Sequence, residues 1–184
     1  MGLDMYLTRK IYVGGNYKHN NVKGEINLTK GEENTPIPVN LDKLKYFEEE
    51  GAYWRKANHI HQWFVDHVQG GVDDCKEYYV DKEQLQELVD TCKKVKDSLK
   101  IKEVKSVPTK VRWGPNGDII QNIETTFFED TSLAEELLPT QAGFFFGGTS
   151  YDSYYLKDIE DTIEMLEPLL AEDDNVEYYY QSSW

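Results

Sequence analysis

The sequence has few of the residues on which common catalytic and covalent frameworks are built. Its 184 residues include 2 cysteines and 4 histidines, and it contains no P-loop, GxGxxG or GxSxG pattern. Two cysteines do not make a disulfide framework, so a reduced, intracellular setting is the simplest interpretation. No apolar run approaches 18 residues, and the start MGLDMYLTRK lacks the layout of a secretory signal. We therefore expect a cytoplasmic protein without a membrane span, a cofactor or a bound metal.

Positive charge is nearly absent from the C-terminal part. Residues 1–113 carry 19 Lys and Arg against 18 Asp and Glu, whereas residues 114–184 carry 16 acids and a single base, Lys157, which together give the net charge of −14. Such a surface repels phosphates, so we expect no direct binding of nucleic acid. Two interpretations stay open. The acidic residues form either a solvated face that keeps the protein soluble or a surface that meets a basic partner.

The apolar patterns predict an α+β fold in a single domain over residues 1–184, with an antiparallel sheet and three to four helices packed mostly on one face. Alternating apolar residues predict strands over 3–13, 22–28 and 37–41. Glycines flank a further apolar strand over 143–147. The pair Asn116-Gly117 predicts a β-hairpin excursion over 101–128. Residues 172–184 are interpreted as an acidic, tyrosine-rich tail.

Helices are predicted where apolar residues recur with a period near 3.6. The predicted ranges are 53–68, about 82–99, 132–138 and about 153–170. Asp81 with Gln84 predicts a capping box for the second helix, and Cys92 falls in its apolar stripe. Pro168 is expected to kink or end the last helix.

The first of these helices carries the candidate ligand site. Trp63 falls outside the apolar arc, beside Lys56, His59 and His67, which indicates a binding surface exposed to solvent. Arg55 beside two aromatic residues can hold a phosphate or carboxylate while a ring stacks on a base. Alternatively, Arg55 pairs with the acidic C-terminal helix or with Asp4.

We expect Arg55 to share a cavity with at least one of Asn58, Gln141 or Tyr151; without a cavity, these residues are fold determinants. The full set of predicted ligand-binding residues is Arg55, Lys56, Asn58, His59, His61, Trp63, Gln141 and Tyr151. The predicted acidic, partner-binding face consists of Asp158, Glu160, Asp161, Glu164 and Glu167.

The histidines and cysteines give weaker signals. His59 and His61 are two residues apart on a helix, so they diverge and cannot share a metal. His67 with Asp73, Asp74 and Glu77 offers a loose cation site, with turn chemistry as the alternative. Cys75 with His61 or His67 and an Asp offers a nucleophile and base, with a buried, hydrogen-bonded His61 as the alternative. No catalytic or metal-ligating residue is assigned.

Three stretches resemble a family of small, uncharacterised proteins of bacteriophage and bacterial genomes. They are the start MGLDMYL, the core YWRKANHIHQWF with GGVDDC, and LPTQAGFFFG with YDSYY. The resemblance covers residues 1 to about 99 and 131 to 171. It implies a phage or mobile-element setting, and hence the cytoplasm of a host cell, but no activity.

Two hypotheses for function follow from these observations. The first is a phage-type, non-catalytic binding protein that interferes with a host process such as defence. It would bind either a small anionic, nucleotide-like ligand or a basic host protein. The second is a small hydrolase or transferase that acts on a nucleotide-like substrate, with His61 or His67 as base beside Asp73, Asp74 or Cys75. The sequence leaves the oligomeric state open.

Overall fold

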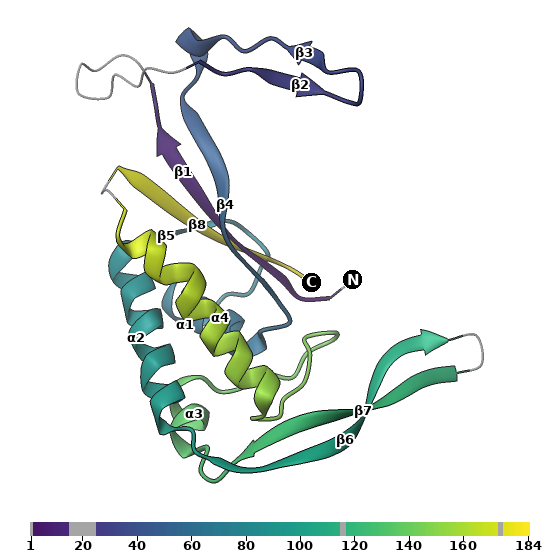
Figure 1. Ribbon diagram of the computed structural model, residues 1–184. Helices are drawn as coiled ribbons and strands as arrows, with labels where there is room; N and C mark the ends of the chain where they lie inside the picture. The colour runs from purple at the N-terminus through teal and green to yellow at the C-terminus, as the bar shows by residue number, and fades with distance from the viewer. Residues whose placement is uncertain (1, 15–24, 115–116, 173–174) are drawn as a thin grey trace.

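A four-stranded antiparallel sheet forms the centre of the molecule (Figure 1). The structure is a computed structural model that describes residues 2–14, 25–114, 117–172 and 175–184. The strand order is β4-β1-β8-β5. These strands are β1 (Asp4–Tyr12), β4 (Tyr46–Arg55), β5 (Tyr78–Val80) and β8 (Val176–Ser183). The expected α+β class with an antiparallel sheet is therefore confirmed.

The helices pack mostly on one face of this sheet, as expected. They are α1 (Asn58–His67), α2 (Lys82–Ser98), α3 (Ser132–Leu137) and α4 (Ser153–Leu170). The ring of Phe64 in α1 stacks on Tyr180 in β8 at 3.9 Å between centroids. Trp54 in β4 donates a hydrogen bond to the hydroxyl of Thr162 in α4 over 2.8 Å. These buried contacts fix two helices on the inner face of the sheet.

The predicted capping box of α2 is confirmed, and α4 begins where it is predicted to begin. Asp81 and Gln84 form the predicted capping box, and the carboxylate of Asp152 accepts hydrogen bonds from the first amides of α4. Cys92 is fully buried in the core, and burial raises the pKa of its thiol to about 12. Its role is therefore that of a small apolar side chain.

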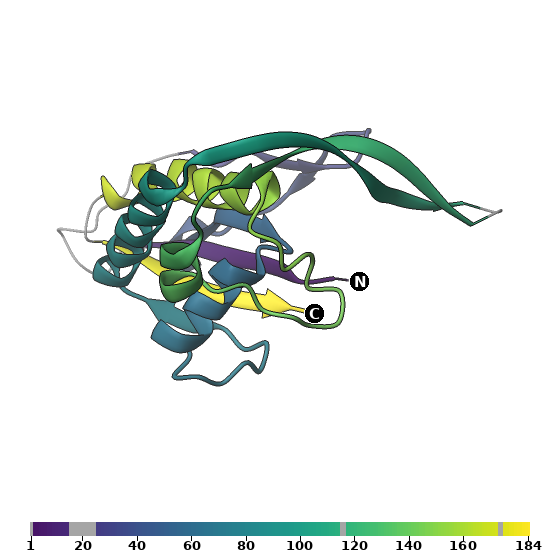
Figure 2. The same ribbon diagram turned by 90° about the horizontal axis from the view of Figure 1, so that it is seen from below.

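Two hairpins project from this body (Figures 1 and 2). The longer one, β6 (Ile101–Gly114) with β7 (Gly117–Phe128), confirms the predicted excursion. The shorter one pairs β2 (Leu28–Lys30) with β3 (Thr35–Ile37). These two strands therefore differ in position from the strands predicted over 22–28 and 37–41. Residues 22–24 lie outside the described residues. A short 3-10 turn, Leu41–Lys43, follows instead.

The C-terminal segment is a central strand rather than a tail. β8 pairs with β1 on one side and with β5 on the other. Its residues alternate, with Tyr178, Tyr180 and Ser182 buried. A tyrosine can occupy either face of a sheet because its ring is apolar and its hydroxyl polar. A run of tyrosines therefore hides the period of two on which strand prediction depends.

Two further predictions about local structure are wrong. Residues 53–55 belong to β4, and the helix begins at Asn58 after a positive φ of 64° at Lys56. Residues 143–147 form a turn instead of a strand, with Phe144 exposed at 85%. The last helix, α4, ends at Leu170, two residues after Pro168, so the expectation that Pro168 ends the helix is met within two residues.

The two adjacent tyrosines of β8 provide a matched test of this sheet. Tyr180→Ala should lower the free energy of unfolding by about 3–5 kcal/mol, because it removes a fully buried ring. Tyr179→Ala should cost about 1 kcal/mol, because its ring lies on the other face and contacts Lys10. Urea denaturation of both variants measures the difference. Equal losses would contradict the assigned strand faces.

Candidate functional site

One side chain, Asn58, ties the start of α1 to the loop of residues 139–150. Its amide nitrogen donates hydrogen bonds to the carbonyl oxygens of Phe146 at 3.2 Å and Gly148 at 2.8 Å. Its side-chain oxygen accepts a hydrogen bond from the backbone N–H of Gln141 at 2.8 Å. Asn58 is buried, so these bonds leave it satisfied. These three hydrogen bonds, called the Asn58 clamp below, bring two segments that are more than 80 residues apart into contact.

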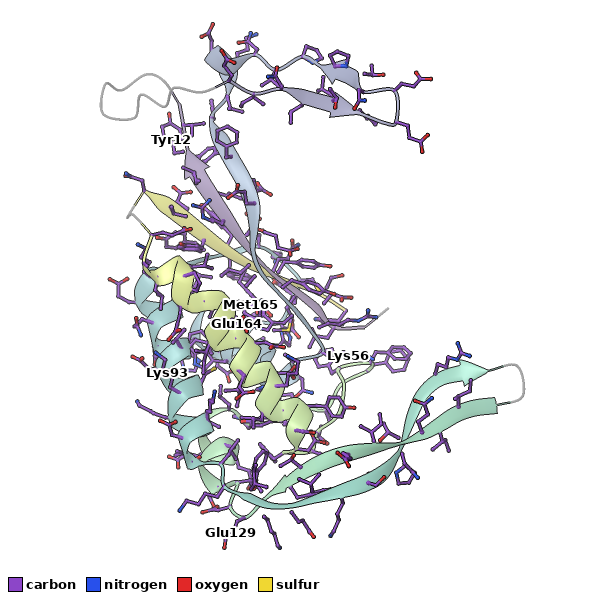
Figure 3. The ribbon with its side chains drawn as sticks, in the orientation of Figure 1. Tyr12, Lys56, Lys93, Glu129, Glu164 and Met165 are labelled. Carbon is purple, nitrogen blue, oxygen red and sulfur yellow. The ribbon has the colours of Figure 1, made fainter. Side chains whose placement is uncertain are left out.

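The loop lies close against the turn between β4 and α1, where Figure 3 shows Lys56. Gly147 has a φ of +101°, and a Cβ atom at this position would approach the carbonyl oxygen of Lys56 to 2.9 Å. Glycine is therefore required here for both conformation and space. The backbone N–H of Lys56 donates a hydrogen bond to the carbonyl oxygen of Leu3 over 2.8 Å. This bond joins the N-terminal segment to the same turn.

A cavity of about 280 Å³ opens beside this clamp. It contains four of the eight predicted ligand residues, and Arg55 shares it with Asn58, as the sequence analysis expects. The lining residues are Arg55, Lys56, Asn58, His59, Thr140, Gly147, Gly148, Ser150, Asp152, Tyr154, Tyr155 and Asp158. The volume is just below the range of about 300–1,000 Å³ that is typical of small-molecule sites.

The starts of two helices meet at this cavity, and they differ in how they are capped. Asp152 caps α4 and accepts hydrogen bonds from the N–H groups of Tyr154 and Tyr155. The N-cap residue of α1 is Ala57, which has no side-chain acceptor. Within the described residues, nothing accepts a hydrogen bond from the N–H groups of His59 and Ile60. These two amides therefore lack a protein acceptor, and of the two residues His59 lines the cavity.

Arg55 and Lys56 add positive charge next to the start of α1. The side chain of Arg55 is 62% exposed, and its Nε lies 3.7 Å from the Oδ1 of Asp4. The Asp4 partner considered in the sequence analysis is therefore present, but the contact is long and leaves most of the guanidinium in solvent. The exposed nitrogens remain able to bind a ligand.

His59 is buried at 2% exposure, not on the solvent face as predicted. Its ring lies 4.3 Å from that of Tyr155, and its Nε2 has no hydrogen-bond partner. Burial lowers its pKa to about 3, so the ring is neutral at physiological pH. The 139–150 loop and α4 cover the side of α1 that the helical pattern alone assigns to solvent. A buried ring nitrogen without a partner at the edge of a cavity indicates a place for a ligand group or a water.

Trp63 is also buried, at 4% exposure, so the predicted exposed tryptophan surface does not exist. Its ring packs edge-on against Phe64 and stacks on His67 at 4.5 Å. α1 is covered on nearly all sides, which a helical projection of one segment cannot reveal.

Three further predicted residues have internal roles. His61 bonds Tyr180 through Nδ1 at 2.8 Å and Asp73 through Nε2 at 3.0 Å, which confirms the buried, hydrogen-bonded alternative. Gln141 contributes its backbone N–H to the clamp. The hydroxyl of Tyr151 accepts a hydrogen bond from the N–H of Thr140. None of the three lines the cavity.

The residues that α4 and its N-cap contribute to the cavity include two acidic ones, Asp152 and Asp158, which form its acidic wall. Burial, followed by the nearby charges of Asp161 and Asp152, raises the pKa of Asp158 to about 7. In the part of the chain that the structure describes, no group donates a hydrogen bond to its carboxylate. The sequence predicts Asp158 on a partner-binding face and predicts the turn over 151–155 as a wall of the pocket, although Asp152, Tyr154 and Tyr155 are not among the predicted ligand residues. The only signal for these residues was the string YDSYY, which begins at Tyr151.

The rest of the predicted acidic face is largely neutralised by lysines. Ion pairs join Glu160 to Lys96 at 2.9 Å, Glu167 to Lys93 at 2.8 Å and Asp161 to Lys157 at 2.7 Å. Glu164 instead lines a neighbouring cavity of about 350 Å³ between α4 and β4, beside Met165 (Figure 3), and Arg55 and Asp158 line both cavities. The face is therefore less negative than its sequence indicates.

Over the described ranges, no group of three His, Cys, Asp or Glu side chains is arranged to hold a metal ion. In the same ranges, no helix is both long enough and apolar enough to cross a membrane. Comparisons with models of known protein families, with curated protein sequences and with solved structures gave no match. The site must therefore be interpreted from its own geometry.

The two titratable groups of the cavity have opposite effects on stability as the pH changes. The folded-state pKa of Asp158, about 7, lies above its ordinary value of 3.8, so acidification from about pH 7 to about pH 4 favours the folded state. The folded-state pKa of His59, about 3, lies below its ordinary value of 6.5, so the same acidification disfavours the folded state.

Asp158→Asn isolates the contribution of Asp158, because His59 and the remaining carboxylates are unchanged. The variant should exceed the wild type in unfolding free energy most at about pH 8. This difference should shrink as the pH falls below about 7, by up to about 1.4 kcal/mol per pH unit. Urea denaturation between about pH 5 and about pH 8 measures it. Parallel curves for the two proteins would show that Asp158 titrates normally.

Proposed function

We propose that this protein is a non-catalytic binding protein for a small anionic, nucleotide-like ligand, held in the cavity at the start of α1. The observation that carries the proposal is the uncapped N-terminus of α1 beside the buried, unpartnered Nε2 of His59. Free backbone N–H groups and the helix dipole together favour an anion at such a position. Arg55 and Lys56 supply the full positive charges that the helix end lacks.

The resemblance to bacteriophage and bacterial proteins suggests where such binding is used. We propose a phage-type role in which the protein sequesters a nucleotide-like molecule and so interferes with a host process such as defence. A basic host protein is the less favoured partner, because Glu160, Asp161 and Glu167 are paired with lysines of the same chain.

One observation favours an enzyme as the second candidate. A carboxylate with a pKa near 7 in a cavity is suited to general acid–base catalysis, and Asp158 has that property. The arrangement of Cys75 with His61 has less support, because both ring nitrogens of His61 are engaged by Tyr180 and Asp73. A hydrolase or transferase would convert a nucleotide substrate into a product. Chromatography of nucleotides that have been incubated with the protein for a long time would detect that product.

The arginines provide a matched test of anion binding. Arg55→Ala should weaken the binding of inorganic phosphate and of nucleoside monophosphates roughly tenfold or more, because a charge-assisted hydrogen bond is lost. Arg112→Ala makes the same change in charge on β6, outside the cavity, and should leave affinity unchanged. Isothermal titration calorimetry at low salt measures both variants.

Two results would count against the proposal. The first is an equal loss in both variants, which would show that only overall charge matters. The second is that the wild-type protein gives no heat of binding with inorganic phosphate or with any of the nucleoside monophosphates. Circular dichroism of Arg55→Ala checks that the fold is intact.

A further inference from the structure

The acidic wall of the cavity, formed by Asp152 and Asp158, is unsuited to a phosphate. It is suited to a different, donor-bearing part of a ligand. Asp152 and Asp158 lie on this wall, while Arg55 and Lys56 lie beside the start of α1. An anionic group is repelled by the first pair and attracted by the second. A ligand that fits both walls has an anionic end and a separate end rich in hydrogen-bond donors.

Asp158 is the acceptor that remains for those donors. One carboxylate oxygen of Asp152 already accepts from the N–H groups of Tyr154 and Tyr155 at the start of α4. Asp158 receives no hydrogen bond from the described residues, and its side chain is half-buried. A half-buried carboxylate without protein donors depends on the little water that reaches it, and a ligand that supplies two donors would replace that water.

Aromatic rings favour a planar donor group. Tyr154 lines the cavity with 53% of its surface exposed, while the ring of Tyr155 is held against His59. An exposed ring at the mouth of a cavity offers a stacking surface for a nucleobase. A compact zwitterion, such as an amino acid, would leave this surface unused.

Building on the proposed function, we propose that Asp158 selects a guanine base and that the ligand is a guanine nucleoside monophosphate. The N1–H and N2–H₂ groups of guanine are adjacent donors that match the two oxygens of an ionised carboxylate. Adenine places an acceptor, N1, beside its single amino group, so it leaves one carboxylate oxygen facing an acceptor. The cavity of about 280 Å³ has room for one nucleotide and not for an oligonucleotide.

Titration calorimetry of the full chain at about pH 8, where Asp158 is ionised, tests this selection with GMP, AMP and inorganic phosphate. Wild-type protein should bind GMP at least about tenfold more tightly than AMP, since a bidentate pair discriminates bases by this order. Asp158→Asn should reduce the ratio of the two affinities to within about threefold, while phosphate affinity should rise rather than fall, because a repelling charge is removed. Glu164→Gln, which removes a charge from the same helix outside this cavity, should keep the wild-type ratio.

The other outcomes separate this inference from the proposed function. Equal affinity of the wild-type protein for GMP and AMP would overturn the guanine assignment and leave anion binding intact. An equal loss of GMP and phosphate binding in Asp158→Asn would also overturn it, because Asp158 would then only maintain the cavity. Tight binding of an amino acid but of no nucleotide would identify a zwitterion site. No binding of any probe to the wild-type protein would refute the proposed function as well.

Discussion

The cavity depends on the three hydrogen bonds of the Asn58 side chain. Asn58 holds the 139–150 loop against the start of α1 through the backbone of Gln141, Phe146 and Gly148. Its amide uses both donors and one acceptor on backbone groups, so a side chain of similar size but different chemistry cannot replace it. Because the loop is held here, it shapes one side of the cavity and covers α1. Asn58 therefore acts on a ligand indirectly, through the position of the loop.

Two helix starts with different capping then give the cavity its polarity. Asp152 satisfies the first amides of α4 with its own carboxylate and leaves negative charge on that side. α1 begins after an alanine, so its first amides and the neighbouring Arg55 and Lys56 make the other side positive. A protein with a net charge of −14 thus keeps a local site for an anion. The separation of charge within the cavity matters more for binding than the total charge of the chain.

The elements that the sequence predicts well are those with strong local signals. The capping box of Asp81 and Gln84 and the Asn-Gly signal for the β6–β7 hairpin each specify structure over a few residues. β8 was missed because buried and exposed tyrosines look alike in sequence. The burial of His59 depends on packing by the distant Tyr155 of α4, and that of Trp63 on tertiary packing, and neither is visible in the pattern of one helix. Arg55 and Asn58 were placed at one cavity correctly, whereas the acidic wall, which requires the fold of α4 over β4, was not.

The central claim is that the start of α1 is an anion site, and the backbone amides there report on it directly. Nuclear magnetic resonance of ¹⁵N-labelled protein, titrated with inorganic phosphate against sodium chloride at equal ionic strength, measures each amide separately. The account predicts saturable shifts that are largest at the N–H groups of His59 and Ile60, which have no acceptor within the described residues. Unchanged His59 and Ile60 signals, with shifts spread over the lysines of β6 and α2, would contradict it.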